Sequence, residues 1–98
     1  MFDIEQVTDE QLYEHLRYVR LKQHWYHAVF QEFDENGHPK VATVYGGYPE
    51  ECISIPRIDE LKRDCQRRYG MTDRAFLLNV SYLGYMTKAQ MQGASNDN

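Results

Sequence analysis

The sequence has no long hydrophobic run, and it holds only two cysteines. No window of the 98 residues approaches the roughly 18 consecutive apolar residues that a membrane-spanning helix requires. The first residues, MFDIEQVTDEQ, lack the basic and apolar regions of a secretory signal peptide. Cys52 and Cys65 form no CxxC pair and no disulfide framework, so both thiols are expected to be reduced. These absences predict a cytoplasmic protein without a membrane segment.

Motifs of the common catalytic sites are also missing. There is no Ser-His-Asp arrangement and no paired-carboxylate pattern, and the glycines of YGGYP are not followed by the Lys-Ser/Thr of a phosphate-binding loop. Cys52 follows Glu50 and Glu51, whose charges disfavour a reactive thiolate. Cys65 has helical spacing from neighbouring apolar residues, which predicts a buried thiol. We therefore expect no catalytic residue and no cofactor.

Composition and charge favour one folded domain. Hydrophobic residues make up 42% of the chain and the net charge is −4, which is too apolar and too weakly charged for a disordered protein. The chain length suits a single domain, expected over residues 1–93, with 94–98 as a flexible polar tail. The acidic balance weighs against general nucleic-acid binding, because such affinity comes from neutralising phosphates.

Helix signals are strong at three places. Thr8 and Gln11 form a capping box for a helix over about residues 9–23. Pro56 suits the first turn of a second helix, and Gly70 suits its left-handed end. A further capping box, Thr87 with Gln90, predicts a short terminal helix.

Strand signals lie between these helices. WYHAVFQEF and KVATVYGG flank an Asn36-Gly37 turn and predict a hairpin. CISI (52–55) is long enough for one short strand, and RAFLLNVSYLGYM (74–86) is expected to be the longest strand, although periodicity alone leaves a buried helix possible there. The order is α-β-β-(β)-α-β-α. It predicts the α+β class, with a mostly antiparallel sheet and helices packed on one face.

The stretch HWYHAVF (24–30) contains two histidines that could bind a metal ion. On a helix His24 and His27 would share a face and could chelate a metal ion, whereas on a strand this spacing places them on opposite faces. The surrounding aromatic and β-branched residues favour a strand. We expect His24 to end the first helix, His27 to lie half-buried on the sheet, and no metal ligands.

Tyrosine is the unusual component, with eight residues in the chain. Tyrosine is enriched at protein interfaces because it offers a large contact area and a polar hydroxyl. Four tyrosines near strand ends or glycines are therefore candidate partner-binding residues: Tyr45, Tyr48, Tyr82 and Tyr85.

Basic residues gather around the second predicted helix and give an alternative. They could contact nucleic acid; they are Arg57, Lys62, Arg63, Arg67, Arg68 and Arg74. Acids are interspersed, and the i,i+4 pairs Asp59–Arg63 and Asp64–Arg68 favour a self-paired, solvated helix instead.

The favoured hypothesis is a small non-enzymatic protein-binding module. It would act stoichiometrically, as an inhibitor, adaptor or immunity-type partner does, through a tyrosine-rich sheet surface. The first alternative is a nucleic-acid-binding protein that uses the basic helix, and the second is a small metal-dependent or thiol enzyme. A free sheet edge also leaves a homodimer open.

Overall fold

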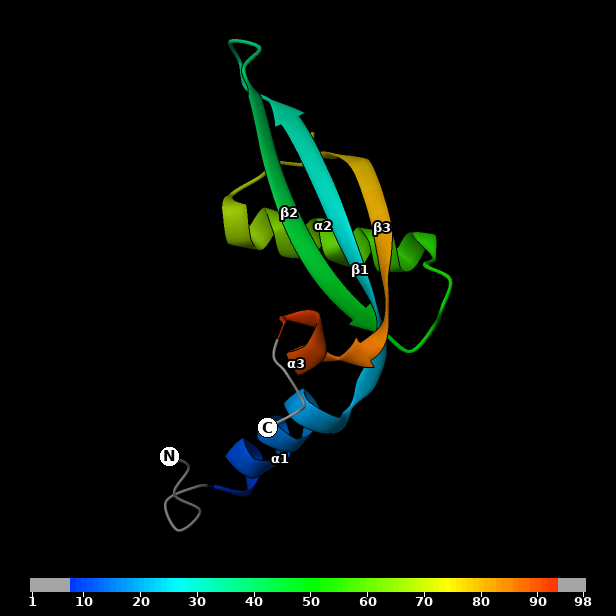
Figure 1. Ribbon diagram of the computed structural model, residues 1–98. Helices are drawn as coiled ribbons and strands as arrows, with labels where there is room; N and C mark the ends of the chain where they lie inside the picture. The colour runs from blue at the N-terminus through cyan, green and yellow to red at the C-terminus, as the bar shows by residue number, and fades with distance from the viewer. Residues whose placement is uncertain (1–7, 94–98) are drawn as a thin grey trace.

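The computed structural model describes residues 8–93 and confirms the α+β class. The elements follow the order α1 (Asp9–Arg20), β1 (Lys22–Phe33), β2 (Pro39–Tyr48), α2 (Ile55–Tyr69), β3 (Phe76–Thr87) and α3 (Lys88–Met91). The three strands form one antiparallel sheet in the order β2-β1-β3. β1 is therefore the central strand (Figure 1). The tail 94–98 lies outside the described residues.

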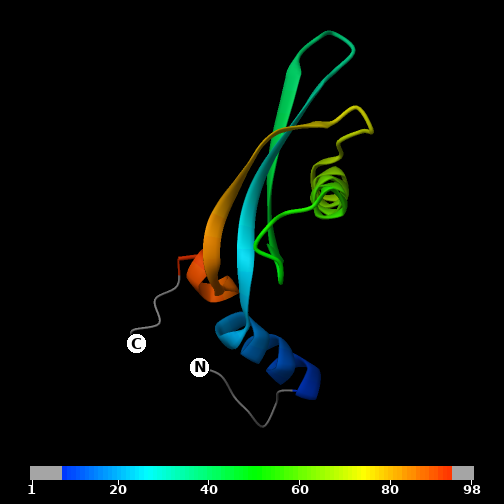
Figure 2. The same ribbon diagram turned by 90° about the vertical axis from the view of Figure 1, so that its right-hand side faces the viewer.

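Helix α2 crosses one face of the sheet and builds the core there (Figure 2). Its buried residues, Leu61 and Cys65, pack on Ala28 and Phe30 of the central strand. Tyr69 has helical spacing from Cys65, but it lies in the last turn of α2 and is exposed.

Helices α1 and α3 lie together at the end of the sheet opposite the hairpin (Figures 1 and 2). The Tyr18 hydroxyl of α1 hydrogen-bonds the Gln92 side chain just after α3, at 2.9 Å. No residue of α1 is fully buried. The molecule is elongated, with a radius of gyration of 16.6 Å, against about 13 Å for a compact chain of this length.

The sequence signals for the start of α1, the end of α2 and the start of α3 are confirmed. The capping boxes Thr8–Gln11 and Thr87–Gln90 are both formed, and Gly70 ends α2 with φ of 67°. The N-cap of α2 is Ser54. The predicted short strand CISI is wrong: these residues form no strand, because Ser54 caps α2 and Ile55 is the first residue of that helix.

The first helix is shorter than predicted, and His24 does not end it. α1 stops at Arg20 because the chain from Lys22 onwards pairs with β3. His24 lies inside β1, opposite Tyr48 on one side and Tyr85 on the other. The segment 76–87 is a strand, as expected.

Candidate protein-binding surface

One face of the sheet is not covered by α2, and we call it the open face. The strands alternate their side chains between the two faces, and the pairing register identifies those that share this one. On β1 they are Gln23, Trp25, His27, Val29, Gln31 and Phe33; on β2 Pro39, Val41, Thr43, Tyr45 and Gly47; on β3 Phe76, Asn79, Ser81, Gly84 and Met86.

The open face carries no charged strand residue and several exposed apolar ones. Phe33 is 49% exposed, Val41 56%, Tyr45 53% and Phe76 42%. The rings of Phe33 and Phe76 stack with centroids 6.2 Å apart. Antiparallel sheets with one face in water usually place polar side chains on that face. This face also carries polar side chains, such as Gln31, Thr43 and Asn79, but its strands carry no charge and expose four apolar side chains. Low charge and a high share of aromatic residues are features of the cores of protein interfaces.

Trp25 and α3 close one end of the open face. The Trp25 indole is buried and its Nε1 donates a hydrogen bond to the Met86 carbonyl at 3.0 Å. A hollow of about 340 Å³ lies between α3 and β2, lined by Trp25, Tyr45 and Met91 among others. Tyr45 therefore belongs both to the lining of this hollow and to the open face. The His27 ring lies 4.8 Å from the Tyr45 ring, and His27 is half-buried as expected.

The structure does not bring the four candidate tyrosines together. Only Tyr45 lies on the open face, whereas Tyr48, Tyr82 and Tyr85 lie on the face that carries α2. Tyr48 is half-buried: the Arg57 guanidinium lies 4.7 Å from its ring centroid, and its hydroxyl donates to the Arg57 carbonyl at 3.4 Å. Burial raises the pKa of Tyr48 above its ordinary value.

Tyr82 and Tyr85 form a cluster with His24 and Tyr26, which we call the tyrosine cluster. Tyr48 adjoins it, because its ring lies 6.3 Å from the Tyr26 ring. His24 Nδ1 lies 2.8 Å from the Tyr82 hydroxyl, and the His24 and Tyr85 rings are 4.7 Å apart. Tyr26 is buried and hydrogen-bonds the Glu51 carbonyl, and burial raises the pKa of Tyr26. His24 and Tyr26, at the centre of this cluster, make contacts with other residues of the chain.

Sequence reasoning missed Phe33, Val41 and Phe76 as surface residues because it assigned strand aromatics and branched residues to the core. One signal could have found part of the surface. Positions 39, 41, 43 and 45 alternate along β2, and all four are uncharged. In contrast, Phe76 could not be placed in this way, because β3 is bulged next to it.

The histidines do not converge. His24 and His27 lie on opposite faces of β1, as their spacing predicts for a strand. His38 is in the hairpin loop, where Nδ1 lies 3.4 Å from an Asp34 carboxylate oxygen. Within residues 8–93 no three His, Cys, Asp or Glu side chains are arranged to hold a metal ion.

The basic residues of α2 are largely engaged with neighbouring acids. Arg57 bonds Glu50 and Glu60, at 3.0 and 3.1 Å. Arg67 and Arg68 both contact Asp64, at 3.3 and 3.2 Å.

The other predicted basic residues, Lys62, Arg63 and Arg74, form no ion pair with an acid within residues 8–93. The Asp64–Arg68 pair is confirmed, whereas no ion pair joins Asp59 and Arg63 in the described structure. Lys62 donates to the Asp73 carbonyl at 3.3 Å. Arg74 follows α2 in the connection to β3, and its backbone N–H bonds the Thr72 hydroxyl at 3.2 Å. The six predicted residues are thus spread along the helix and the connection after it.

The cysteines occupy different environments. Cys65 is fully buried in the core, where burial raises the pKa of its thiol, and Cys52 is exposed. Neither forms a disulfide. The buried thiol behaves as a small hydrophobic group.

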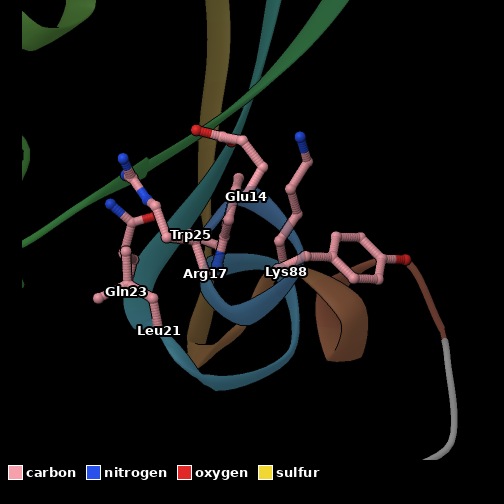
Figure 3. A pocket seen from close by; sticks show the side chains of 7 residues that line it. Glu14, Arg17, Leu21, Gln23, Trp25 and Lys88 are labelled. Carbon is pink, nitrogen blue, oxygen red and sulfur yellow. The ribbon is translucent and has the colours of Figure 1, made fainter. Parts of the chain in front are cut away.

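A second hollow, of about 300 Å³, lies between α1, the start of β1 and α3 (Figure 3). Its lining includes Glu14, Arg17, Lys88 and the edge of Trp25. Glu14 is negatively charged and Arg17 and Lys88 are positively charged. No Ser, Cys or His lines the hollow. It therefore offers no serine or cysteine nucleophile and no histidine base.

No helix within residues 8–93 has both the length and the apolar character needed to cross a membrane. Comparisons of the chain with protein-family models, curated proteins and solved structures find no match.

Proposed function

We propose that this chain is a non-enzymatic protein-binding module that docks one partner protein on its open face and acts stoichiometrically. One observation supports this most: a sheet face without charged strand residues carries four large exposed apolar side chains, Phe33, Val41, Tyr45 and Phe76. Burying such a side chain contributes about 1.5–3 kcal/mol. Leaving four of them in water on one face is therefore costly unless a partner covers them.

The chemistry of the open face defines the partner. Since a charge that is desolvated against an uncharged surface loses its hydration without compensation, the matching surface must itself be apolar or aromatic and poor in charge. The polar groups of the face, His27, Thr43 and Asn79, can supply the few hydrogen bonds that fix orientation. Such a partner is a folded protein with an apolar patch, and not a phosphate backbone.

The experiment is a pull-down from the native cell with matched surface variants. The open-face variant is Val41→Glu with Tyr45→Glu. The control variant is Ile55→Glu with Tyr85→Glu, which also replaces one exposed aliphatic residue and one exposed tyrosine but lies away from the open face. Any captured protein is then purified and mixed with the chain to measure the stoichiometry.

The expected result is a partner that binds one-to-one per chain and is retained by the wild type and the control but lost by the open-face variant. Loss in the control with retention in the open-face variant would instead assign binding to the tyrosine cluster. That outcome overturns the proposed site.

A gel shift with DNA or RNA is the outcome that favours the alternative function, nucleic-acid binding. If the chain shifts DNA or RNA in a gel at moderate salt, and Arg63→Glu with Arg67→Glu abolishes the shift, the basic helix is the functional surface. The proposal expects no shift, because Arg57, Arg67 and Arg68 are paired with acids.

A further inference from the structure

Helix α1 has an exposed seam that no other described part of the chain covers. Tyr13 is 59% exposed and Leu16 37%, and they line a shallow apolar hollow with Arg17, Arg20 and Leu21. Leu12, Tyr18 and Val19 of α1 are half-buried and face the rest of the molecule. The seam lies beside this side of the helix, because Leu16 is one turn after Leu12, whereas Tyr13 and Arg20 lie further round at exposed positions.

The seam residues have the spacing of a helix–helix contact. Asp9, Tyr13, Leu16 and Arg20 are separated by four, three and four residues. This is the spacing of the a and d positions that pack between two helices. The two inner positions are apolar and the two outer ones are oppositely charged.

The charges of α1 are segregated along its length. Asp9 and Glu10 lie in its first turn, and Arg17 and Arg20 in its last turn. Asp9 and Arg20 are exposed, and neither makes an ion pair within the described residues. A helix with this pattern repels a parallel copy of itself and attracts an antiparallel one.

We infer that α1 is a homodimerisation element, which pairs antiparallel with α1 of a second copy of this chain. The pairs Asp9–Arg20 and Tyr13–Leu16 share one midpoint, between residues 14 and 15. A two-fold axis through that midpoint sets Tyr13 of each copy against Leu16 of the other. The same axis sets each Asp9 against the other copy's Arg20. The surface is therefore self-complementary, as a two-fold interface must be.

The size of the contact sets the strength of the dimer. α1 has 12 residues and is about 18 Å long, so two such helices form an interface at the small end of the range for specific complexes. The dimer is accordingly weak and concentration-dependent. It leaves the open face free, and it does not depend on the proposed partner protein.

Sedimentation equilibrium with charge-reversal variants tests the dimer. In a dimer of the Asp9→Arg variant, position 9 of each copy would place an arginine against Arg20 of the other copy. In a dimer of the Arg20→Asp variant, position 20 of each copy would place an aspartate against Asp9 of the other copy. Each variant alone is expected to dissociate roughly tenfold more easily, since two attractive exposed pairs become repulsive.

The decisive sample is the equimolar mixture of the two variants. A heterodimer of Asp9→Arg with Arg20→Asp has an acid opposite a base at both ends of the seam, so mixing restores wild-type association. Circular dichroism of each variant checks that α1 remains folded.

Two results would overturn the inference. One is a wild-type chain that stays monomeric at every concentration tested. The other is a dimer whose dissociation constant is unchanged in both variants, or which mixing fails to restore. Either result leaves the proposed function standing, because the open face is tested by partner binding.

Discussion

Trp25 and Gly47 face each other across the β1–β2 ladder, and a Cβ atom on Gly47 would stand 2.8 Å from the Trp25 ring. Its neighbour Gly46 points to the opposite face, where a Cβ atom would stand 2.5 Å from the Leu61 side chain of α2. The two adjacent glycines therefore let Trp25 and Leu61 pack on opposite faces of β2. This is a structural reason for the two glycines of the YGGYP stretch.

Replacing Gly47 is expected to destabilise the protein. In Gly47→Ala the added methyl group overlaps the rigid Trp25 ring and the Gln23 side chain, since it would also lie 2.8 Å from Gln23 Oε1. Overpacking of this kind costs about 1–3 kcal/mol. Urea denaturation followed by Trp25 fluorescence measures the change. Thr43→Ala, at an exposed position of the same strand, is the control, and an equal loss there would contradict the packing explanation.

Glu32 is expected to stabilise the fold in a pH-dependent way. Its carboxylate accepts hydrogen bonds from the Thr72 backbone N–H at 2.7 Å and from the Thr72 hydroxyl at 2.9 Å. The N–H bond is the main cause that holds the pKa of Glu32 below its ordinary value of 4.5. Because the folded pKa is the lower one, the stabilisation is present above 4.5 and is lost as pH falls through the folded value.

The measurement is the thermal midpoint from pH 7 down to pH 3 for wild type and Glu32→Gln. The variant is expected to melt lower than wild type at neutral pH, and the gap is expected to close as the solution becomes acidic. Glu35→Gln in the exposed hairpin loop is the control. A gap that stays constant with pH would show that Glu32 does not act through its charge.

Tyr26 is expected to fix the connection between β2 and α2. Tyr26→Phe removes the hydroxyl that bonds the Glu51 carbonyl, at a cost of about 1 kcal/mol in the free energy of unfolding. Tyr18→Phe removes an exposed hydrogen bond to Gln92 and is expected to cost less. Chemical denaturation of both variants makes the comparison, and a Tyr26→Phe chain as stable as the wild type would be inconsistent with this role.

The two thiols are expected to differ strongly in reactivity. Cys52 is exposed, whereas Cys65 is fully buried and burial raises its pKa, so little reactive thiolate forms there. A colourimetric thiol reagent at mildly alkaline pH should modify one thiol per native chain, and both after unfolding in urea. Cys52→Ser should remove the fast reaction. Rapid modification of two thiols in the native chain would mean that the core around Cys65 opens readily.

Local chemistry made much of the fold predictable. The caps at Thr8 and Thr87 and the glycine end at Gly70 depend on residues within a few positions of one another, so the pattern alone reveals these helix ends. The N-cap Ser54 was not recognised, because the apolar residues around it also suit a strand. α1 ends at Arg20, before the predicted end, because pairing with distant β3 overrides local helix propensity.

The candidate surface was harder to predict, because it depends on which face of each strand looks outward. β3 shifts register twice against β1, between Trp25 and Tyr26 and between Val29 and Phe30. Each shift inserts an extra residue and breaks the two-residue alternation. Tyr82 and Tyr85 therefore share a face although their sequence spacing is odd. In a strand without bulges, this spacing would place the two tyrosines on opposite faces.

The most direct measurement is calorimetric titration of the purified partner protein with wild type and with the Val41→Glu, Tyr45→Glu variant. The predicted result is a one-to-one complex per chain for the wild type, with affinity weakened at least about thirtyfold in the variant, as expected when charges enter the centre of an interface. The Ile55→Glu, Tyr85→Glu control is predicted to bind as the wild type does. Equal affinity of wild type and open-face variant would contradict the assignment of the open face as the binding surface.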